Sequence, residues 1–113
     1  MREFVGLQGA SGATYRFRHW PRSDPHLPIA GNYVVIREAD DGFAILALDV
    51  SDDLSLVPQS LKRPLREQAE CQIYTRLNVS RATRVAEQED IAAANKLRHL
   101  AQPPSEGSVA SAG

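Results

Sequence analysis

Alternating apolar and polar residues indicate two strands at the start of the chain. In EFVGLQ and TYRFRHW the apolar and aromatic side chains recur at every second position, as in a strand with one buried face. The intervening GASGA segment has two glycines, which adopt positive φ angles without strain and so favour a turn. Residues 2–20 are therefore predicted to form a β-hairpin, and the three prolines of WPRSDPHLP predict a loop after it.

The middle of the chain predicts three more strands. The unbroken apolar run in GNYVVIRE, 31–38, is typical of a central strand covered on both faces. ADDG, 39–42, predicts a tight turn, after which FAILAL, 43–48, returns antiparallel. The polar segment 51–69 is expected to hold only short helical turns. CQIYTRLNV, 71–79, predicts a strand with one polar side, whose other side carries Cys71, Ile73, Thr75, Leu77 and Val79.

Helical periodicity begins near Ser80, which is a good N-cap residue. The predicted apolar stripe of this helix consists of Ala82, Val85, Ala86, Ala93, Leu97 and Leu100. Residues 102–113, with two prolines and many small residues, are predicted to be a disordered tail. The element order predicts one α+β domain over residues 1–101. Its small, mostly antiparallel sheet carries the N-terminal hairpin and the C-terminal helix packed on it.

Composition adds limits to this picture. The chain of 113 residues has 42% hydrophobic residues and a net charge of −1, so no overall field attracts nucleic acid or an anionic membrane. No apolar run approaches the about 20 residues of a membrane span, and the N-terminus lacks a signal-peptide core. A cytoplasmic location is therefore expected. Cys71, the only cysteine, forms no internal disulfide and is expected to be a reduced, packed side chain.

The acidic cluster in DVSDDLS has two interpretations. The carboxylates of Asp49 and Asp53 are ligands of the kind that Mg²⁺ prefers. Alternatively, one of the short polar side chains from Ser51 to Asp53 caps a short helix that begins at Leu54. We favour the cap, because clusters of Asp and Ser are common at turns.

Other motifs point away from familiar catalytic sites. His19, His26 and His99 lie on three separate predicted elements, and no HxH or HExxH pattern occurs. The glycines of GLQGASG, 6–12, are followed by a predicted strand rather than by the Lys and helix of a phosphate-binding loop. These features predict surface histidines and a hairpin turn.

Basic residues occur in three groups. On the second strand of the hairpin, Arg16 and Arg18 alternate with aromatic residues, so we expect arginines on one face and Tyr15, Phe17 and Trp20 on the other. The other groups are Lys62, Arg63 and Arg66, and then Arg76, Arg81 and Arg84. Convergence of these groups on one surface would create a binding site for a nucleic-acid backbone, whereas separate groups would simply be solvated.

The order of short motifs resembles the GIY-YIG endonuclease superfamily over residues 3–95. Gly31-Asn32-Tyr33 stands for the first motif, and Ala47-Leu48-Asp49 falls where the second is expected. The family's short D-D-L-S run, its strand ending in L-N and its R-x-A-E helix also have counterparts, at residues 50–55, 77–78 and 84–92. The resemblance implies this fold and phosphodiester cleavage with one divalent metal. It implies an activated tyrosine or water, an arginine on the phosphate and a helical glutamate on the metal.

The chain departs from the family at most of those positions. The second tyrosine is replaced by Ala47, the arginine by Val57 and the metal-binding glutamate by Gln88, which leaves Tyr33 as the one match. An alanine has no phenol, a valine has no charge, and a neutral amide is a poor anchor for Mg²⁺.

The remaining candidate metal ligands are Asp49, Glu87 and Glu89. On an ideal helix, Glu89 is expected near the predicted apolar stripe and Glu87 well away from it. Neither glutamate is therefore a direct replacement for the missing ligand.

These observations predict a degenerate, non-catalytic binding module that needs no cofactor and has a nucleic-acid or protein partner. The residues predicted to contact nucleic acid are Arg16, Arg18, Lys62, Arg63, Arg76, Arg81 and Arg84. One alternative is a residual Mg²⁺-dependent nuclease that uses Tyr33, Asp49, Glu87 or Glu89, and a borrowed arginine such as Arg63 or Arg66. The other is a structural subunit of an assembly.

Overall fold

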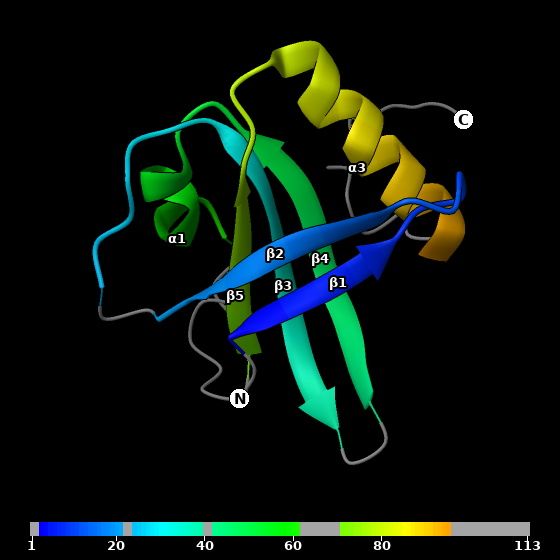
Figure 1. The fold of residues 1–113 in the computed structure, drawn as a ribbon. Coiled ribbons are helices and arrows are strands. Elements are labelled where there is room, and N and C mark those ends of the chain that lie inside the picture. The colour runs from blue at the N-terminus through cyan, green and yellow to red at the C-terminus, as the bar shows by residue number, and fades with distance from the viewer. Residues whose placement is uncertain (1–2, 22–23, 40–41, 62–70, 96–113) are drawn as a thin grey trace.

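In a computed structural model of the chain, the described residues are 3–21, 24–39, 42–61 and 71–95. The predicted tail, the predicted helix positions Leu97 and Leu100, and His99 lie outside them. The described elements are β1 (Phe4–Gln8), β2 (Thr14–Trp20), β3 (Gly31–Ala39), β4 (Gly42–Ser51), η1 (Leu54–Leu56), α1 (Val57–Ser60), β5 (Cys71–Leu77) and α3 (Arg81–Asn95) (Figure 1). No helix within these ranges is long and apolar enough to cross a membrane.

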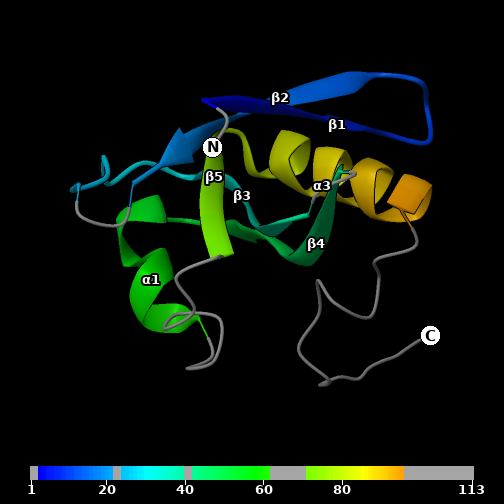
Figure 2. The same cartoon turned by 90° about the horizontal axis from the view of Figure 1, so that it is seen from below.

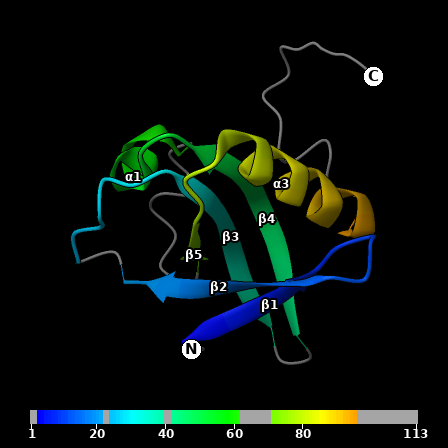
Figure 3. The same cartoon turned by 45° about the horizontal axis from the view of Figure 1, so that its top comes forward.

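The five strands form one antiparallel sheet in the order β1-β2-β5-β3-β4. Strand β5 is inserted between the β1–β2 and β3–β4 hairpins, with His19 and Val34 placed on either side of Tyr74. Figure 2 shows α3 between the β1–β2 hairpin and β4, and Figure 3 shows α1 well away from α3. The predicted α+β fold, with its N-terminal hairpin and C-terminal helix, is confirmed.

Each face of the sheet has its own hydrophobic cluster. The cluster under α3 consists of Val5, Leu7, Phe17, Val34, Ile36, Leu48, Tyr74, Ile91 and Ala92. The cluster under η1 and α1 consists of Trp20, Val35, Leu54, Val57, Leu61, Cys71 and Ile73. Strand β3 contributes to both clusters, as its unbroken apolar run predicted, because neighbouring residues on a strand point to opposite faces.

Strand β5 differs from its predicted pattern. Its second side carries the polar residues Gln72 and Arg76 as predicted, but it is covered, with Tyr74 buried in the α3 cluster and both polar residues half-buried. On the predicted apolar side, Leu77 is exposed, and Val79 is exposed beyond the end of the strand. The prediction failed because alternation reports one buried face, whereas a strand between two others can be covered on both.

The predicted stripe of α3 is also wrong in part. Ala82, Ala86 and Ala93 are exposed, whereas the buried residues of the helix are Arg84, Ile91 and Ala92. An alanine methyl buries little apolar surface, so the larger Ile91 and the hydrogen bonds of Arg84 set the rotation of the helix. The predicted N-cap is confirmed, because the Ser80 hydroxyl accepts a hydrogen bond from the Thr83 N–H at 3.3 Å.

The β1–β2 turn is attached to the last turns of α3. Asp90 accepts hydrogen bonds from the Ser11 N–H at 2.9 Å, the Ser11 hydroxyl at 2.6 Å and the Tyr15 hydroxyl at 2.8 Å. Gly12 has a φ of +94°, the positive φ expected of a glycine in this turn. One carboxylate therefore holds the hairpin against the helix.

Gly31 lies where β3 passes very close to the end of β5. A Cβ atom at this position would collide with the carbonyl oxygen of Arg76 and would lie 2.8 Å from Leu54 Cδ1. We predict that Gly31→Ala lowers the free energy of unfolding by about 1–3 kcal/mol, measured by denaturant titration, because backbone must move to make room.

A matched control is Gly6→Ala, whose Cβ would meet a movable side-chain methyl of Thr14 at 3.0 Å. The loss there should be smaller. An equal loss in the two variants would contradict the close-approach explanation.

The contact of Asp90 with the hairpin makes stability depend on pH. Hydrogen bonds from Ser11, and then from Tyr15, lower the pKa of Asp90 below its ordinary value of 3.8. The ionised form therefore favours the folded state. This stabilisation is complete above the unfolded-state pKa and is lost as the pH falls through the folded-state pKa.

We predict that Asp90→Asn lowers the Tm at neutral pH, and that the Tm difference from the wild type shrinks below about pH 4. Thermal denaturation across this pH range measures it. The control is Glu89→Gln, at an exposed neighbouring position. A Tm difference that stays constant with pH would contradict the proposed role of the charge.

Candidate functional site

The positions that correspond to nuclease residues are divided between the two faces of the sheet. Tyr33, Ala47 and Val57 belong to the cluster under η1 and α1. Gln88 is on α3, against the other face, where its side-chain amide donates to the Leu48 carbonyl at 3.4 Å. The fold therefore brings three of these positions together and keeps the fourth apart.

Tyr33 is held in its neutral form. It pairs with Asp49 across the β3–β4 ladder, and burial, followed by the negative charge of Asp49, raises the pKa of Tyr33 to about 12. Burial also raises the pKa of Asp49, whose carboxylate accepts a hydrogen bond from the Val50 N–H at 2.8 Å. A phenol with this pKa supplies almost no phenolate at neutral pH.

The candidate metal ligands do not converge. Asp49 faces Tyr33, and Glu89 is exposed on α3. Asp53 is the N-cap of η1 and accepts a hydrogen bond from the Ser55 N–H at 3.0 Å, which confirms the capping interpretation of DVSDDLS. Within the described ranges, no group of three or more His, Cys, Asp or Glu side chains is placed to hold a metal ion.

Glu87 points inward, so the prediction that it points well away from the buried face is wrong. Its carboxylate accepts hydrogen bonds from Arg76 Nε at 2.8 Å and from the Asn78 amide at 2.9 Å. The same Asn78 amide also donates to Asn32, which is buried and in turn donates to the Arg84 carbonyl at 3.0 Å. Because Arg84 and Ile91 set the rotation of α3, Glu87 lies over the end of β5.

Arg84 is a structural residue of the β5–α3 connection. Its guanidinium donates to the Val79 carbonyl at 2.8 Å and to Asp52 at 2.8 Å, and only 3% of the residue is exposed. Arg81 is exposed and lies 3.8 Å from the same Asp52 carboxylate. Neither Arg81 nor Arg84 lines the groove on the β2–β5 part of the sheet. Lys62, Arg63 and Arg66 lie outside the described residues.

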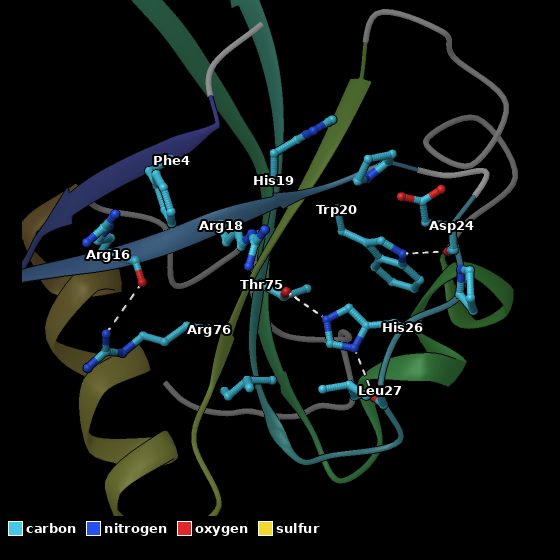
Figure 4. A pocket seen from close by; sticks show the side chains of 13 residues that line it. Phe4, Arg16, Arg18, His19, Trp20, Asp24, His26, Leu27, Thr75 and Arg76 are labelled. Carbon is cyan, nitrogen blue, oxygen red and sulfur yellow. Dashed lines mark hydrogen bonds between the residues drawn. The ribbon is translucent and has the colours of Figure 1, made fainter.

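Three predicted arginines line one groove of about 600 Å³ on the β2–β5 part of the sheet (Figure 4). These are Arg16 and Arg18 of β2 and Arg76 of β5. Thr75 and Leu77 of β5 share the face of Arg16 and Arg18, whereas Arg76 starts from the α3 face, where it binds Glu87, and also lines the groove. Pro21 and the residues from Asp24 to Leu27 form a wall of the groove. The fold thus joins the first basic group of the sequence to one member of the third.

The wall is attached to the sheet by its aromatic residues. Trp20 Nε1 donates to the Asp24 carbonyl at 2.8 Å, and the rings of Trp20 and His26 meet edge to face with centroids 4.6 Å apart. His26 Nε2 lies 2.9 Å from Thr75 Oγ1, and His26 Nδ1 lies 2.9 Å from the Leu27 carbonyl oxygen. These contacts attach Asp24, His26 and Leu27 to the β2–β5 part of the sheet.

Trp20 corrects the predicted division of β2. It lines the groove beside Arg16 and Arg18, although the aromatic residues were expected on the opposite face. Tyr15 and Phe17 do pack towards α3, as expected. Even-numbered residues of β2 share a face, so the parity of Trp20 was available in the sequence as a signal. His26, by contrast, reaches the groove through the loop, which no local pattern predicts.

The arginines of the groove differ in how they are paired. Arg76 is bound to Glu87 and also donates to the Arg16 carbonyl at 3.4 Å. The Arg16 guanidinium lies over the Phe4 ring, with Cζ 3.6 Å from the ring centroid. Arg18 is exposed and has no acidic partner among the described residues. The groove therefore presents two guanidinium groups without carboxylate partners among the described residues.

No protein-family model, curated protein or solved structure matches the chain.

Glu87 binds Arg76, and the substitution Glu87→Gln removes the negative charge with little change in the shape of the side chain. We predict that Glu87→Gln lowers the free energy of unfolding by about 1–2 kcal/mol, measured by denaturant titration, because a hydrogen-bonded ion pair becomes a neutral contact. The control is Glu89→Gln, at an exposed position on the same helix. Equal effects of the two substitutions would show that Glu87 contributes only surface charge.

Proposed function

We propose that this chain is a non-catalytic module that binds nucleic acid through the groove lined by Arg16, Arg18 and Arg76. The observation that carries the proposal is the pair of guanidinium groups on β2 that lack carboxylate partners in the described ranges. A guanidinium group can donate two parallel hydrogen bonds to phosphate oxygens. Arginines without carboxylate partners are therefore well suited to bind phosphate groups.

The GIY-YIG resemblance is part of this proposal, as a scaffold that has lost the nuclease chemistry. Ala47 supplies no phenol and Val57 no guanidinium. Tyr33 is neutral at physiological pH, and Gln88 donates to a backbone carbonyl on the other face of the sheet. Stabilising a cleaved phosphodiester needs charge directed at the phosphate, and these positions offer none. The groove, in contrast, presents the guanidinium groups of Arg16 and Arg18.

The net charge of −1 does not conflict with a local anion-binding surface. Phosphate contacts act within about one Debye length, roughly 10 Å at moderate ionic strength, so groove arginines act more strongly than distant acids. Asp24 also lines the groove, apart from Arg16 and Arg18 (Figure 4). It is the one carboxylate among the described lining residues, so the arginines are in excess.

The role of Arg18 can be tested by binding fluorescently labelled DNA and RNA of mixed sequence at several salt concentrations. We predict that Arg18→Gln weakens binding most at low salt. We also predict that it reduces the magnitude of the slope of log K against log salt by about 0.7, the value for one phosphate contact on a single strand. The change in slope gives the number of counterions released by the contact between Arg18 and a phosphate.

A matched control is Arg37→Gln, which makes the same change in net charge at an exposed β3 position that does not line the groove. It should leave the slope within experimental error of the wild type. If neither DNA nor RNA binds at low salt, or if the two variants weaken binding equally, the groove is not a nucleic-acid site.

A further inference from the structure

Phosphate contacts do not account for the apolar side chains at the groove. Among the described residues, five large hydrophobic side chains are exposed, and three of them line this groove. These are Phe4, 37% exposed, Leu27, 57% exposed, and Leu77, 53% exposed. Exposed apolar side chains that gather at one place generally indicate a binding surface, because scattered ones would not be expected to coincide with a cavity.

We propose that the groove binds single-stranded nucleic acid and takes up an unpaired base against Phe4 and Leu27, while Arg18 contacts the adjacent phosphate. This inference rests on the proposed function and names the form of its ligand. An unpaired base has two apolar faces and a polar edge. The groove offers both apolar and polar side chains to contact them.

The arrangement of the side chains suits a base more than a phosphate alone. Arg16 already lies over Phe4, so the ring and the guanidinium form a stack that a base can extend. His26 and Thr75 also line the groove, where His26 Nε2 lies 2.9 Å from Thr75 Oγ1 (Figure 4), and the Thr75 hydroxyl oxygen has a further lone pair that can accept a hydrogen bond from a base edge. The volume of about 600 Å³ lies within the roughly 300–1,000 Å³ typical of small-molecule sites.

A duplex fits this groove less well than a single strand. Duplex bases are stacked inside the helix, and a protein reads their edges by inserting a projecting helix or β-ribbon into the groove of the DNA. Here the binding surface is itself concave, and the exposed side chains of Phe4, Leu27 and Leu77 line it. Splaying a base out of a single strand costs less than extracting one from a duplex, which favours unpaired ligands.

Trp20 allows occupancy of the groove to be followed directly. It is the only tryptophan of the chain and lines the groove, so a change in tryptophan emission reports this site alone. The probes are a thymidine homo-oligomer, the same oligomer in abasic form, and the homo-oligomer annealed to its complement. We expect the homo-oligomer to quench Trp20 and to bind on the order of tenfold more tightly than the abasic oligomer or the duplex.

Two groove variants and one control identify the residues responsible. Phe4→Leu and Leu27→Ala should each remove most of the preference for the base-bearing oligomer, while leaving the weaker binding of the abasic oligomer unchanged. Leu56→Ala is the control, because Leu56 is as exposed as Leu27, at 57%, but does not line the groove. The two groove variants act through different side chains, so misfolding of one would not remove the test.

The outcomes separate this inference from the proposed function. Equal binding of base-bearing and abasic oligomers, with Arg18 still required, would support a phosphate-binding module and overturn the uptake of a base. Tighter binding of the duplex would overturn the single-strand inference in the same way. If none of the probes binds at low salt, the inference and the proposed function both fail. Free thymidine monophosphate that competes as well as the oligomer would show that the ligand is a nucleotide rather than a strand.

Discussion

Insertion of β5 between two hairpins is the constraint on which the rest of this structure depends. Its backbone pairs with β2 on one side and with β3 on the other. Its side chains alternate between the two clusters, with Tyr74 under α3 and Ile73 under α1. A hairpin alone in water is marginally stable, so β5 makes one sheet, with two cores, out of two weak units.

The end of β5 also places the polar groups that orient α3. Arg76 and Asn78 both bind Glu87, and Arg84 donates to the Asn78 and Val79 carbonyls. A buried guanidinium is costly where its donors lack partners, and the Nη1 and Nη2 groups of Arg84 find acceptors in this rotation of the helix, although the buried Nε has none. Asp90 attaches the far end of the helix to the first hairpin. The helix is thus held by polar contacts at both ends and by Ile91 between them.

The groove exists because helical segments cover only part of one face of the sheet. The short η1 and α1 pack over the β3–β5 part of the sheet, on Val35 and Ile73. The neighbouring β2–β5 part is bordered instead by the loop that carries His26. Sheet residues that would be covered by a longer helix are exposed there, which places Arg18 and Leu77 at the surface. An open sheet surface of this kind joins charged and apolar side chains from segments far apart in the sequence.

Sequence patterns by themselves determined the elements of this protein. Period-two alternation, the glycine of the β1–β2 turn and the caps Ser80 and Asp53 act within a few residues, so the sequence alone identified the strands, that turn, the start of the helix and the α+β class. The inward direction of Glu87, the burial of Arg84 and the meeting of Arg16 and Arg18 with Arg76 were decided only in the tertiary structure. Each depends on hydrogen bonds and packing between residues many positions apart. An alanine-rich helix has no dominant apolar stripe, so its partners rather than its own pattern decide which side is buried.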